Sequence, residues 1–181
     1  DNGQIIDDTI VYTFTNDSYM LVPNASMVTK ICDWLNLKSA DFEVSIDNKS
    51  DDFFCFAVQG PEAPRLLRQQ FNLSITPFKL LEIGNLIISG TGYTGKKGYE
   101  IMGPISESSD VWKSFLDMGA IPIGLGARDT LRLEKGYLLS GTDFNGKQTT
   151  LESGYSWVID WNHDFIGKDK LLLQKEEGHK L

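Results

Sequence analysis

Residues 90–104 read GTGYTGKKGYEIMGP, and this stretch decides between two fold classes. A glycine-rich run that leads into a helix is typical of nucleotide-binding folds, in which backbone N–H groups contact phosphate at the start of the helix. Here the glycines lead into GYEIMGP, which has two glycines and a proline around an alternating centre. We therefore predict a connection between two strands, the second at Tyr99–Met102. Lys97 also stands where a phosphate-binding loop needs Ser or Thr.

Segments typical of strands and helices alternate on both sides of this stretch. The predicted strands are residues 9–15, 19–22, 42–46, 53–58, 78–83 and 85–89. The predicted helices are residues 27–35, capped within 24–26, and residues 60–70, 108–116 and 127–134. Because most neighbouring strands form hairpins, we predict an α+β fold with antiparallel sheets and flanking helices. The polar residues 47–52 mark a boundary between domains.

Composition excludes several classes of partner. The chain has 181 residues, a net charge of −8 and 41% apolar residues, as expected for one ordinary domain or two small ones. The acidic balance argues against nucleic acid and anionic membranes. The longest apolar run, Phe53–Val58, is far shorter than the roughly 20 residues that cross a bilayer. Cys32 and Cys55 are too few for a metal cluster and indicate a reducing, intracellular compartment.

The Asp7-Asp8 pair precedes the first strand. Side chains alternate along a strand, so Asp8 shares a face with Ile10, Tyr12 and Phe14. A carboxylate among aromatic rings has a raised pKa and is suited to proton transfer or to a cationic ligand. Spacing alone favours the simpler interpretation, a solvated acid at the entrance to a strand.

The helix predicted near residues 124–134 carries two arginines on adjacent turns. Arg128 and Arg132 are placed to bind an anion, but Asp129 and Glu134 are equally placed to neutralise them. Spacing leaves these alternatives open.

The histidines and tryptophans have simpler interpretations. His163 and His179 lie far apart in the chain and have no serine or cysteine arranged for a catalytic triad. We expect both histidines at the surface, and we expect Trp112 and Trp157 in the core.

Six blocks of sequence, in this order, resemble the glycine cleavage T-protein family, the aminomethyltransferases. The blocks are IIDDTIV (5–11), VPNAS (22–26), QGPEA (59–63), TGYTG with GYE (91–95 and 98–100), GLGARDTLRLE (124–134), and Trp157 with DFIGK (164–168). The resemblance runs the length of the chain, and six ordered blocks are far more specific than any one of them.

The resemblance implies a tetrahydrofolate-binding fold with two interlocked subdomains. It implies residues 1–49 in one folate-binding subdomain, 50–146 in the second, and 147–181 as a linker and the start of a C-terminal barrel. The family transfers a one-carbon unit from the aminomethyl-lipoyl arm of H-protein to tetrahydrofolate, its co-substrate, and releases ammonia. No metal, nucleic acid or membrane is implied. The compartment is the cytoplasm in a prokaryote and the mitochondrial matrix in a eukaryote.

The resemblance also implies roles for six residues. Asp8 matches the catalytic carboxylate, which orients the nucleophilic nitrogen of folate and stabilises positive charge as ammonia leaves. Glu100 matches the glutamate that accepts hydrogen bonds from the pterin. The other matching folate-site positions are Tyr12, Asn24, Tyr93 and Arg128. Arg132 is expected to be structural.

The chain departs from the family pattern in two ways. Lys96-Lys97 replaces an acidic pair, and Gly90 replaces an arginine. Our hypothesis is that the lysines contact an anion, either the polyglutamate tail of folate or an acidic carrier protein. The family's opening segment is missing before Asp1 and the chain stops near the start of the barrel, so we expect a fragment or a shortened relative that binds folate only in part.

Three alternatives are carried forward. The first is a related one-carbon enzyme, either a dimethylglycine or sarcosine dehydrogenase folate domain or a dimethylsulfoniopropionate demethylase; the Gly-Ala-Arg-Asp sequence at 126–129 favours the T-protein instead. The second is a non-catalytic folate-binding scaffold of the iron–sulfur assembly type, disfavoured because residues 135–138 read KGYL and lack that group's cysteine. The third is the nucleotide-binding protein argued against above.

Overall fold

The computed structural model describes residues 2–178, so His179 lies outside the described residues. The chain forms two compact units. Unit 1 comprises Asp1–Ile46 with Leu138–Leu181, and unit 2 comprises Asp47–Tyr137. Residues after 137 therefore group with the beginning of the chain rather than forming a separate segment. The assignment of functional domains stays a prediction.

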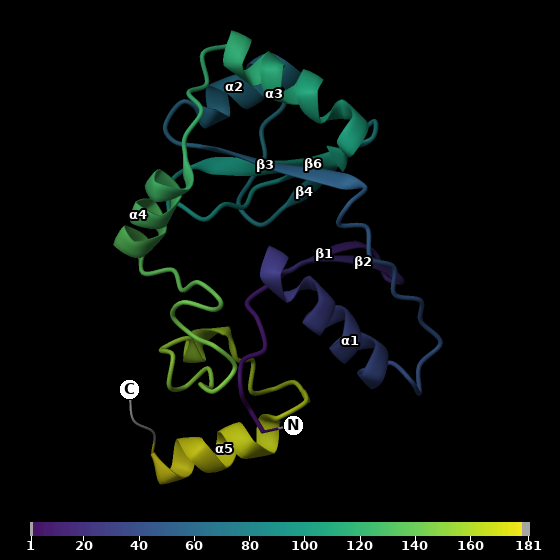
Figure 1. Ribbon diagram of the computed structural model, residues 1–181, viewed down its shortest axis with the longest axis vertical. Helices are drawn as coiled ribbons and strands as arrows, with labels where there is room; N and C mark the ends of the chain where they lie inside the picture. Colours follow the sequence, from purple (N-terminus) through teal and green to yellow (C-terminus); the bar gives the residue numbers. More distant parts are fainter. Residues whose placement is uncertain (1, 179–181) are drawn as a thin grey trace. The chain divides into compact units, whose positions relative to one another are not determined.

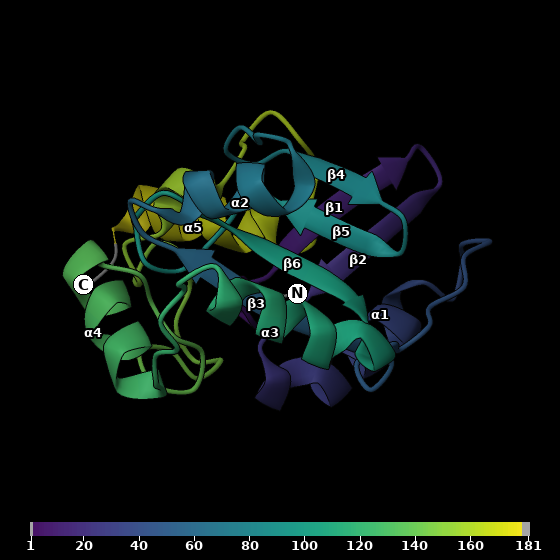
Figure 2. The same ribbon diagram turned by 90° about the horizontal axis from the view of Figure 1, so that it is seen from above.

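Unit 2 is built on a four-stranded sheet. Its strands are β3 (Phe53–Gln59), β4 (Leu80–Ile83), β5 (Leu86–Ser89) and β6 (Gly98–Pro104). They lie in the order β3-β6-β5-β4, and every pairing is antiparallel (Figure 2). The glycine-rich stretch connects β5 to β6, as the strand prediction required.

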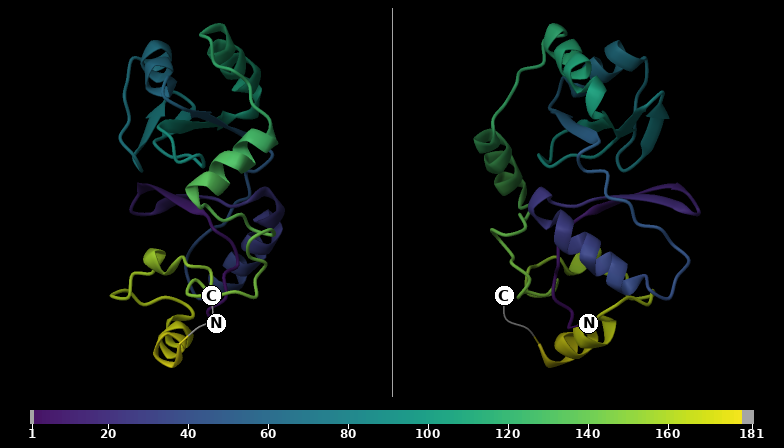
Figure 3. Two further views of the ribbon diagram at one scale, coloured as in Figure 1. Left: turned by 90° about the vertical axis from the view of Figure 1, so that its left-hand side faces the viewer. Right: turned by 45° about the vertical axis from the view of Figure 1, so that its right-hand side comes forward.

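Two helices cover one face of this sheet. They are α2 (Ala63–Phe71) and α3 (Ser108–Asp117), with the short 3-10 turn η2 (Ile105–Glu107) before α3 (Figures 1 and 3). The core between helices and sheet consists of Phe54, Ala63, Leu66, Leu67, Leu86, Ile88, Tyr99, Ile101, Val111 and Phe115. Alternate residues of the strands supply this core, so the residues between them, Glu100 among them, belong to the other face of the sheet.

A further helix of unit 2, α4 (Leu125–Lys135), begins after the extended Gly124. It ends at Gly136, whose φ of 78° is the left-handed conformation that closes many helices. The α4 helix carries Arg128 and Arg132.

Unit 1 contains a two-stranded hairpin and two longer helices. Strands β1 (Ile10–Thr15) and β2 (Ser18–Val22) pair antiparallel, and the 3-10 turn η1 (Ala25–Met27) leads into α1 (Val28–Lys38). The remaining elements are the 3-10 turn η3 (Ser156–Val158) and α5 (Lys168–Glu177). The Ile5 backbone N–H donates to the Gln148 carbonyl at 2.9 Å, which ties residues after 137 to the beginning of the chain.

The α+β class and the antiparallel sheets are confirmed, but three details of the prediction are wrong. Residues 42–46 form no strand, because this alternating segment pairs with no strand among the described residues. Its Phe42 is accordingly 71% exposed. Trp112 and Trp157 are not core, at 43% and 75% exposed. Val111 and Phe115 point α3 toward the sheet, and Trp112 lies about 100° around the helix from Val111.

No helix within residues 2–178 is both long enough and apolar enough to cross a membrane. His163 is exposed at the surface, as predicted.

Candidate functional site

The predicted site residues fall into two groups, one in each unit. In unit 1, Asn24 joins the Asp7-Asp8 pair. Its side-chain amide donates to Asp7 Oδ1 and to Asp8 Oδ1, both at 2.8 Å, and its backbone N–H donates to Asp7 Oδ2 at 2.9 Å. Asn24 precedes η1 but does not cap it with its side chain, because the amide is engaged by the two aspartates. The predicted capping region, residues 24–26, therefore contains the N-cap position of η1, at Asn24, but no side-chain hydrogen bond caps η1 or α1.

This arrangement leaves Asp8 in an environment that disfavours its charge. Desolvation by the surrounding protein raises the pKa of the Asp8 carboxyl, and the negative charge of Asp7 raises it further; the hydrogen bond from Asn24 works in the opposite direction. Tyr12 of β1 is buried, whereas Asp8 precedes this strand, which begins at Ile10. A half-buried carboxyl whose pKa is raised holds its proton to higher pH than an ordinary aspartate and is suited to proton transfer.

In unit 2, a chain of hydroxyl groups fixes Glu100. The Thr91 hydroxyl donates to Glu100 Oε2 at 2.5 Å. The Ser89 hydroxyl, which is fully buried, lies 2.8 Å from Thr91 Oγ1. Because Thr91 has one hydroxyl proton and gives it to Glu100, Ser89 is the donor in that second bond. One carboxylate oxygen is thus held in place, while Oε1 is left to accept from a ligand.

Arg128 and Tyr93 lie together beside the same loop. The Arg128 guanidinium carbon is 4.9 Å from the centre of the Tyr93 ring, a cation–π arrangement. The Tyr93 ring also stacks on Tyr137, with ring centres 5.6 Å apart and planes 24° apart. A planar cation and a stacked aromatic pair are typical of sites for flat heteroaromatic ligands.

The structure decides between the two arginines that spacing left open. Arg132 is 3% exposed; its Nε donates to Asp129 Oδ1 at 2.7 Å and its Nη1 to the Tyr137 carbonyl at 3.0 Å. Arg132 is therefore structural. Arg128 is exposed, and the described residues offer it no carboxylate partner, so its charge is available to a ligand.

Glu100 and Arg128 act electrostatically on one neighbour, Cys55 of β3. Although part of the Cys55 side chain reaches solvent, desolvation of the thiol and the charge of Glu100 raise its pKa to about 12, and Arg128 offsets this in part. The thiol stays protonated at neutral pH, so Cys55 is not an activated nucleophile.

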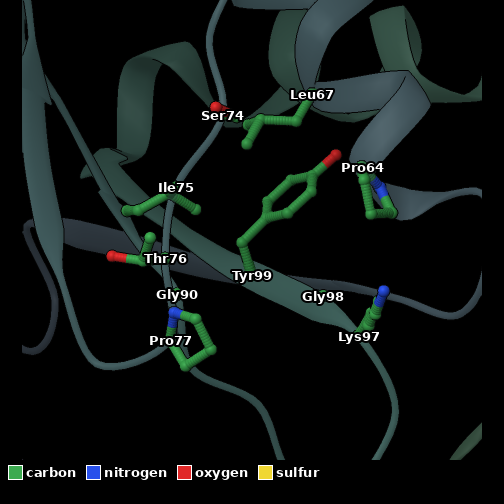
Figure 4. Close-up of a pocket in the computed structure, with 10 residues that line it drawn as sticks. All are labelled: Pro64, Leu67, Ser74, Ile75, Thr76, Pro77, Gly90, Lys97, Gly98 and Tyr99. Carbon is green, nitrogen blue, oxygen red and sulfur yellow. The ribbon is translucent and has the colours of Figure 1, made fainter.

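Two cavities lie elsewhere in the units. One of about 310 Å³ in unit 2 surrounds the Tyr99 ring, whose hydroxyl donates to the Ala63 carbonyl at 2.7 Å (Figure 4). None of the six predicted residues lines this cavity. The other, of about 420 Å³ in unit 1, includes Asp7. Across residues 2–178, His, Cys, Asp and Glu side chains form no group suited to a metal ion.

Sequence reasoning missed Thr91 and Gln59, which contact the predicted residues or their loop. Both belong to blocks that resemble the family, residues 59–63 and 91–95, but the sequence suggests no separate role for either. The signal for Gln59 is a polar side chain at the end of the apolar segment 53–58, immediately before a Gly-Pro turn, where an unpaired amide would be costly.

Comparison with known proteins places these clusters in a family. The family model described as the GCVT N-terminal domain matches residues 1–163, which include all six predicted site residues. The chain belongs to the GCVT N-terminal domain family. Similar curated members of this family are aminomethyltransferases from Thermosipho melanesiensis (40% identical), Halothermothrix orenii (38%) and Pseudothermotoga lettingae (42%).

Alignments with these GCVT relatives cover 97–98% of the chain but only 51–53% of each relative. The chain thus spans about half the length of the curated relatives it matches. The crystal structure of glycine cleavage system aminomethyltransferase T from Bartonella henselae is similar with a TM-score of 0.88 and 28% identity, over 98% of this chain and 51% of that one.

Proposed function

We propose that this GCVT-family chain binds tetrahydrofolate and contributes the catalytic carboxylate of an aminomethyltransferase. The reaction transfers the one-carbon unit of aminomethyl-lipoyl H-protein to tetrahydrofolate. The sulfur–carbon and carbon–nitrogen bonds of the aminomethyl group break, and two bonds form from the carbon to folate nitrogens. The two N–H protons of folate leave with the other products, one on the lipoyl thiol and one on ammonia, so the reaction needs no oxidant.

The observation that carries this proposal is the Asp7-Asp8 pair held by Asn24. Asp8 is half-buried, has a raised pKa, and accepts one hydrogen bond from an amide at 2.8 Å. Such a carboxyl can orient an N–H group of folate and, once ionised, stabilise the positive charge that develops as ammonia leaves. Tyr12 is proposed to line the folate site beside it.

The second cluster supports a pterin as the ligand. Glu100 Oε2 is held by Thr91, which leaves Oε1 as an acceptor for the amino and ring N–H groups of a pterin. Arg128 and the stacked ring of Tyr93 supply a flat, positively charged surface. We propose that Glu100, Tyr93 and Arg128 of unit 2 contact the pterin of tetrahydrofolate.

Ligand binding tests the folate part of the proposal. Tetrahydrofolate is expected to stabilise the chain against heat, while ATP and NAD are not, because only a ligand that prefers the native state raises Tm. Glu100→Gln replaces a carboxylate acceptor with an amide and is expected to weaken binding by about 10-fold, the equivalent of one charge-assisted hydrogen bond of roughly 1.5 kcal/mol. Stabilisation by a nucleotide and not by tetrahydrofolate would refute the proposal.

Turnover tests the catalytic part. With the full protein and aminomethylated H-protein, Asp8→Asn is expected to lower the rate of ammonia release by about 100-fold or more, the usual contribution of a positioned acid or base. Asp33→Asn, which removes an exposed carboxylate of α1, is the matched control and should leave the rate unchanged. Equal rates for the two variants would exclude Asp8 as the catalytic carboxylate.

A further inference from the structure

The glycine-rich loop between β5 and β6 closes around one side chain, that of Gln59 at the end of β3. Gln59 Nε2 donates to the Thr91 carbonyl at 3.2 Å and to the Tyr99 carbonyl at 3.1 Å. Its Oε1 accepts from the Thr94 hydroxyl at 3.0 Å. Both amide hydrogens and the amide oxygen are thus used, and they hold two positions of the loop, Thr91 and Thr94, to each other and to Tyr99 of β6.

Two of the loop glycines make room for this amide. A Cβ on Gly92 would lie 2.0 Å from Gln59 Oε1, and a Cβ on Gly98 would lie 2.6 Å from Gln59 Cδ. A side chain at position 92 would require Gln59 to move, and one at position 98 would also lie 2.6 Å from the Val58 carbonyl oxygen. Of the three glycines that match a phosphate-binding fingerprint, Gly92 approaches the Gln59 amide, Gly90 approaches the Thr76 carbonyl, and Gly95 has a φ of 64°. These requirements of the protein's own packing explain why the loop is glycine-rich although no helix follows it.

The held loop carries the groups assigned to the pterin. Tyr93 lies between the two loop threonines, and the Thr91 hydroxyl donates a hydrogen bond to Glu100. We propose that Gln59 is a positioning residue for tetrahydrofolate binding: it contacts no substrate itself but fixes the backbone from which Tyr93 and Thr91 project. This inference rests on the function proposed above and adds a residue to its site.

Limited proteolysis measures how firmly the loop is held, and it needs no ligand. Lys96 and Lys97 are trypsin sites within the loop, so a loosened loop is cut faster. Gln59→Met keeps the side-chain volume and removes all three hydrogen bonds, and we expect trypsin to cut this loop at least 10-fold faster. Gln59→Glu keeps the acceptor for Thr94 but turns a carboxylate oxygen toward the Thr91 and Tyr99 carbonyls, which are acceptors too, so we expect cleavage at least as fast as in Gln59→Met. The matched control is Gln69→Met, an exposed glutamine of α2, which should leave the cleavage rate unchanged.

Folate binding supplies the second measurement. We expect Gln59→Met to raise the Kd for tetrahydrofolate by 10- to 100-fold. With the full protein, it should raise KM for tetrahydrofolate much more than it lowers kcat, because Asp8 is held by other contacts. A general loss of folding would lower the amount of active protein, and hence the apparent kcat, while KM for tetrahydrofolate would stay the same. Circular dichroism verifies that each variant is folded, and Gln59→Glu serves if Gln59→Met is not.

Unchanged trypsin cleavage in a folded Gln59→Met variant overturns the inference, and so does faster cleavage with an unchanged Kd. If the unsubstituted chain fails to bind tetrahydrofolate while the variant loop is cut faster, the proposed function is wrong, the folate role assigned to Gln59 falls with it, and its hold on the loop stands.

Discussion

At the scale of single residues, Asp7 and Asp8 of unit 1 are neighbours in the chain, but their carboxyl groups receive different hydrogen bonds from Asn24. Asn24 offers two amide hydrogens to the pair and its backbone N–H to Asp7 alone. Asp7 thus receives two hydrogen bonds from Asn24 and Asp8 one from its side-chain amide. With less compensation for its desolvation, Asp8 keeps a pKa above the ordinary 3.8.

This difference predicts a pH-dependent cost in stability. The native state binds a proton at Asp8 at higher pH than the unfolded chain does, so the contribution of Asp8 is most favourable below its ordinary pKa and is lost as pH rises through the native value. Asp8→Asn retains an acceptor for Asn24 and carries no charge. Its Tm relative to the unsubstituted chain should therefore increase from pH 4 to pH 7.5, whereas the Asp33→Asn difference should not follow this trend. A Tm difference for Asp8→Asn that decreases with pH would contradict the raised pKa.

At the scale of elements, periodicity in the sequence predicts most helices and strands because burial imposes that periodicity. The hairpin of unit 1, the four strands of unit 2 and helices α1 to α4 all begin within a few residues of the expected positions. Residues 42–46 have the alternation of a strand and yet form none, because a strand also needs a partner, and the sequence does not say which one is available.

The candidate site likewise has features that local sequence predicts and contacts that it does not. Alternation predicts Asp8 and Tyr12 on one strand face, but β1 begins at Ile10 and leaves Asp8 outside the strand, and only the resemblance suggests roles for the two residues. The contacts of Gln59 with Thr91 and Tyr99 join residues 32 and 40 positions apart. Such pairings depend on strand register, which local sequence does not determine.

The packing of α3 on the sheet leads to a stability prediction. Phe115 is buried, with ring centres 6.3 Å from Phe71 and 6.4 Å from Tyr99, so Phe115→Ala leaves a cavity and should lower the free energy of unfolding by about 3–5 kcal/mol. Trp112→Ala, on the same helix, removes a larger but half-exposed side chain with one ring contact, to Phe56, and should cost clearly less. Urea unfolding followed by circular dichroism measures both changes. Equal losses would contradict the assigned direction of the helix.

At the scale of the whole molecule, three lysines of unit 2 form a positively charged group in a chain whose net charge is negative. The chain carries a net charge of −8, yet Lys96 and Lys97 follow Gly95, and the side chain of Lys135 packs over that glycine, with Cδ 2.5 Å from the position of an added Cβ. Lys49 and Lys168 each pair with aspartates, whereas the part of the chain described here provides no acidic partner for Lys96, Lys97 or Lys135. Three ammonium groups without an acidic partner among the described residues attract an anion. That this anion is the polyglutamate tail of folate, or an acidic carrier protein, stays a prediction.

Reversing two of these charges tests this prediction. Lys96→Glu with Lys97→Glu should weaken binding of polyglutamyl tetrahydrofolate by about 5- to 30-fold at low salt, since exposed ion pairs contribute roughly 0.2–1 kcal/mol each and reversal adds repulsion. Binding of the monoglutamate should change little, and the difference should shrink as salt shortens the range of the charges. Lys79→Glu with Lys113→Glu makes the same change in net charge elsewhere in unit 2 and should have no such effect. If both folates bind the reversed variant as before while KM for the acidic carrier rises, the lysines contact the carrier protein and not the folate tail.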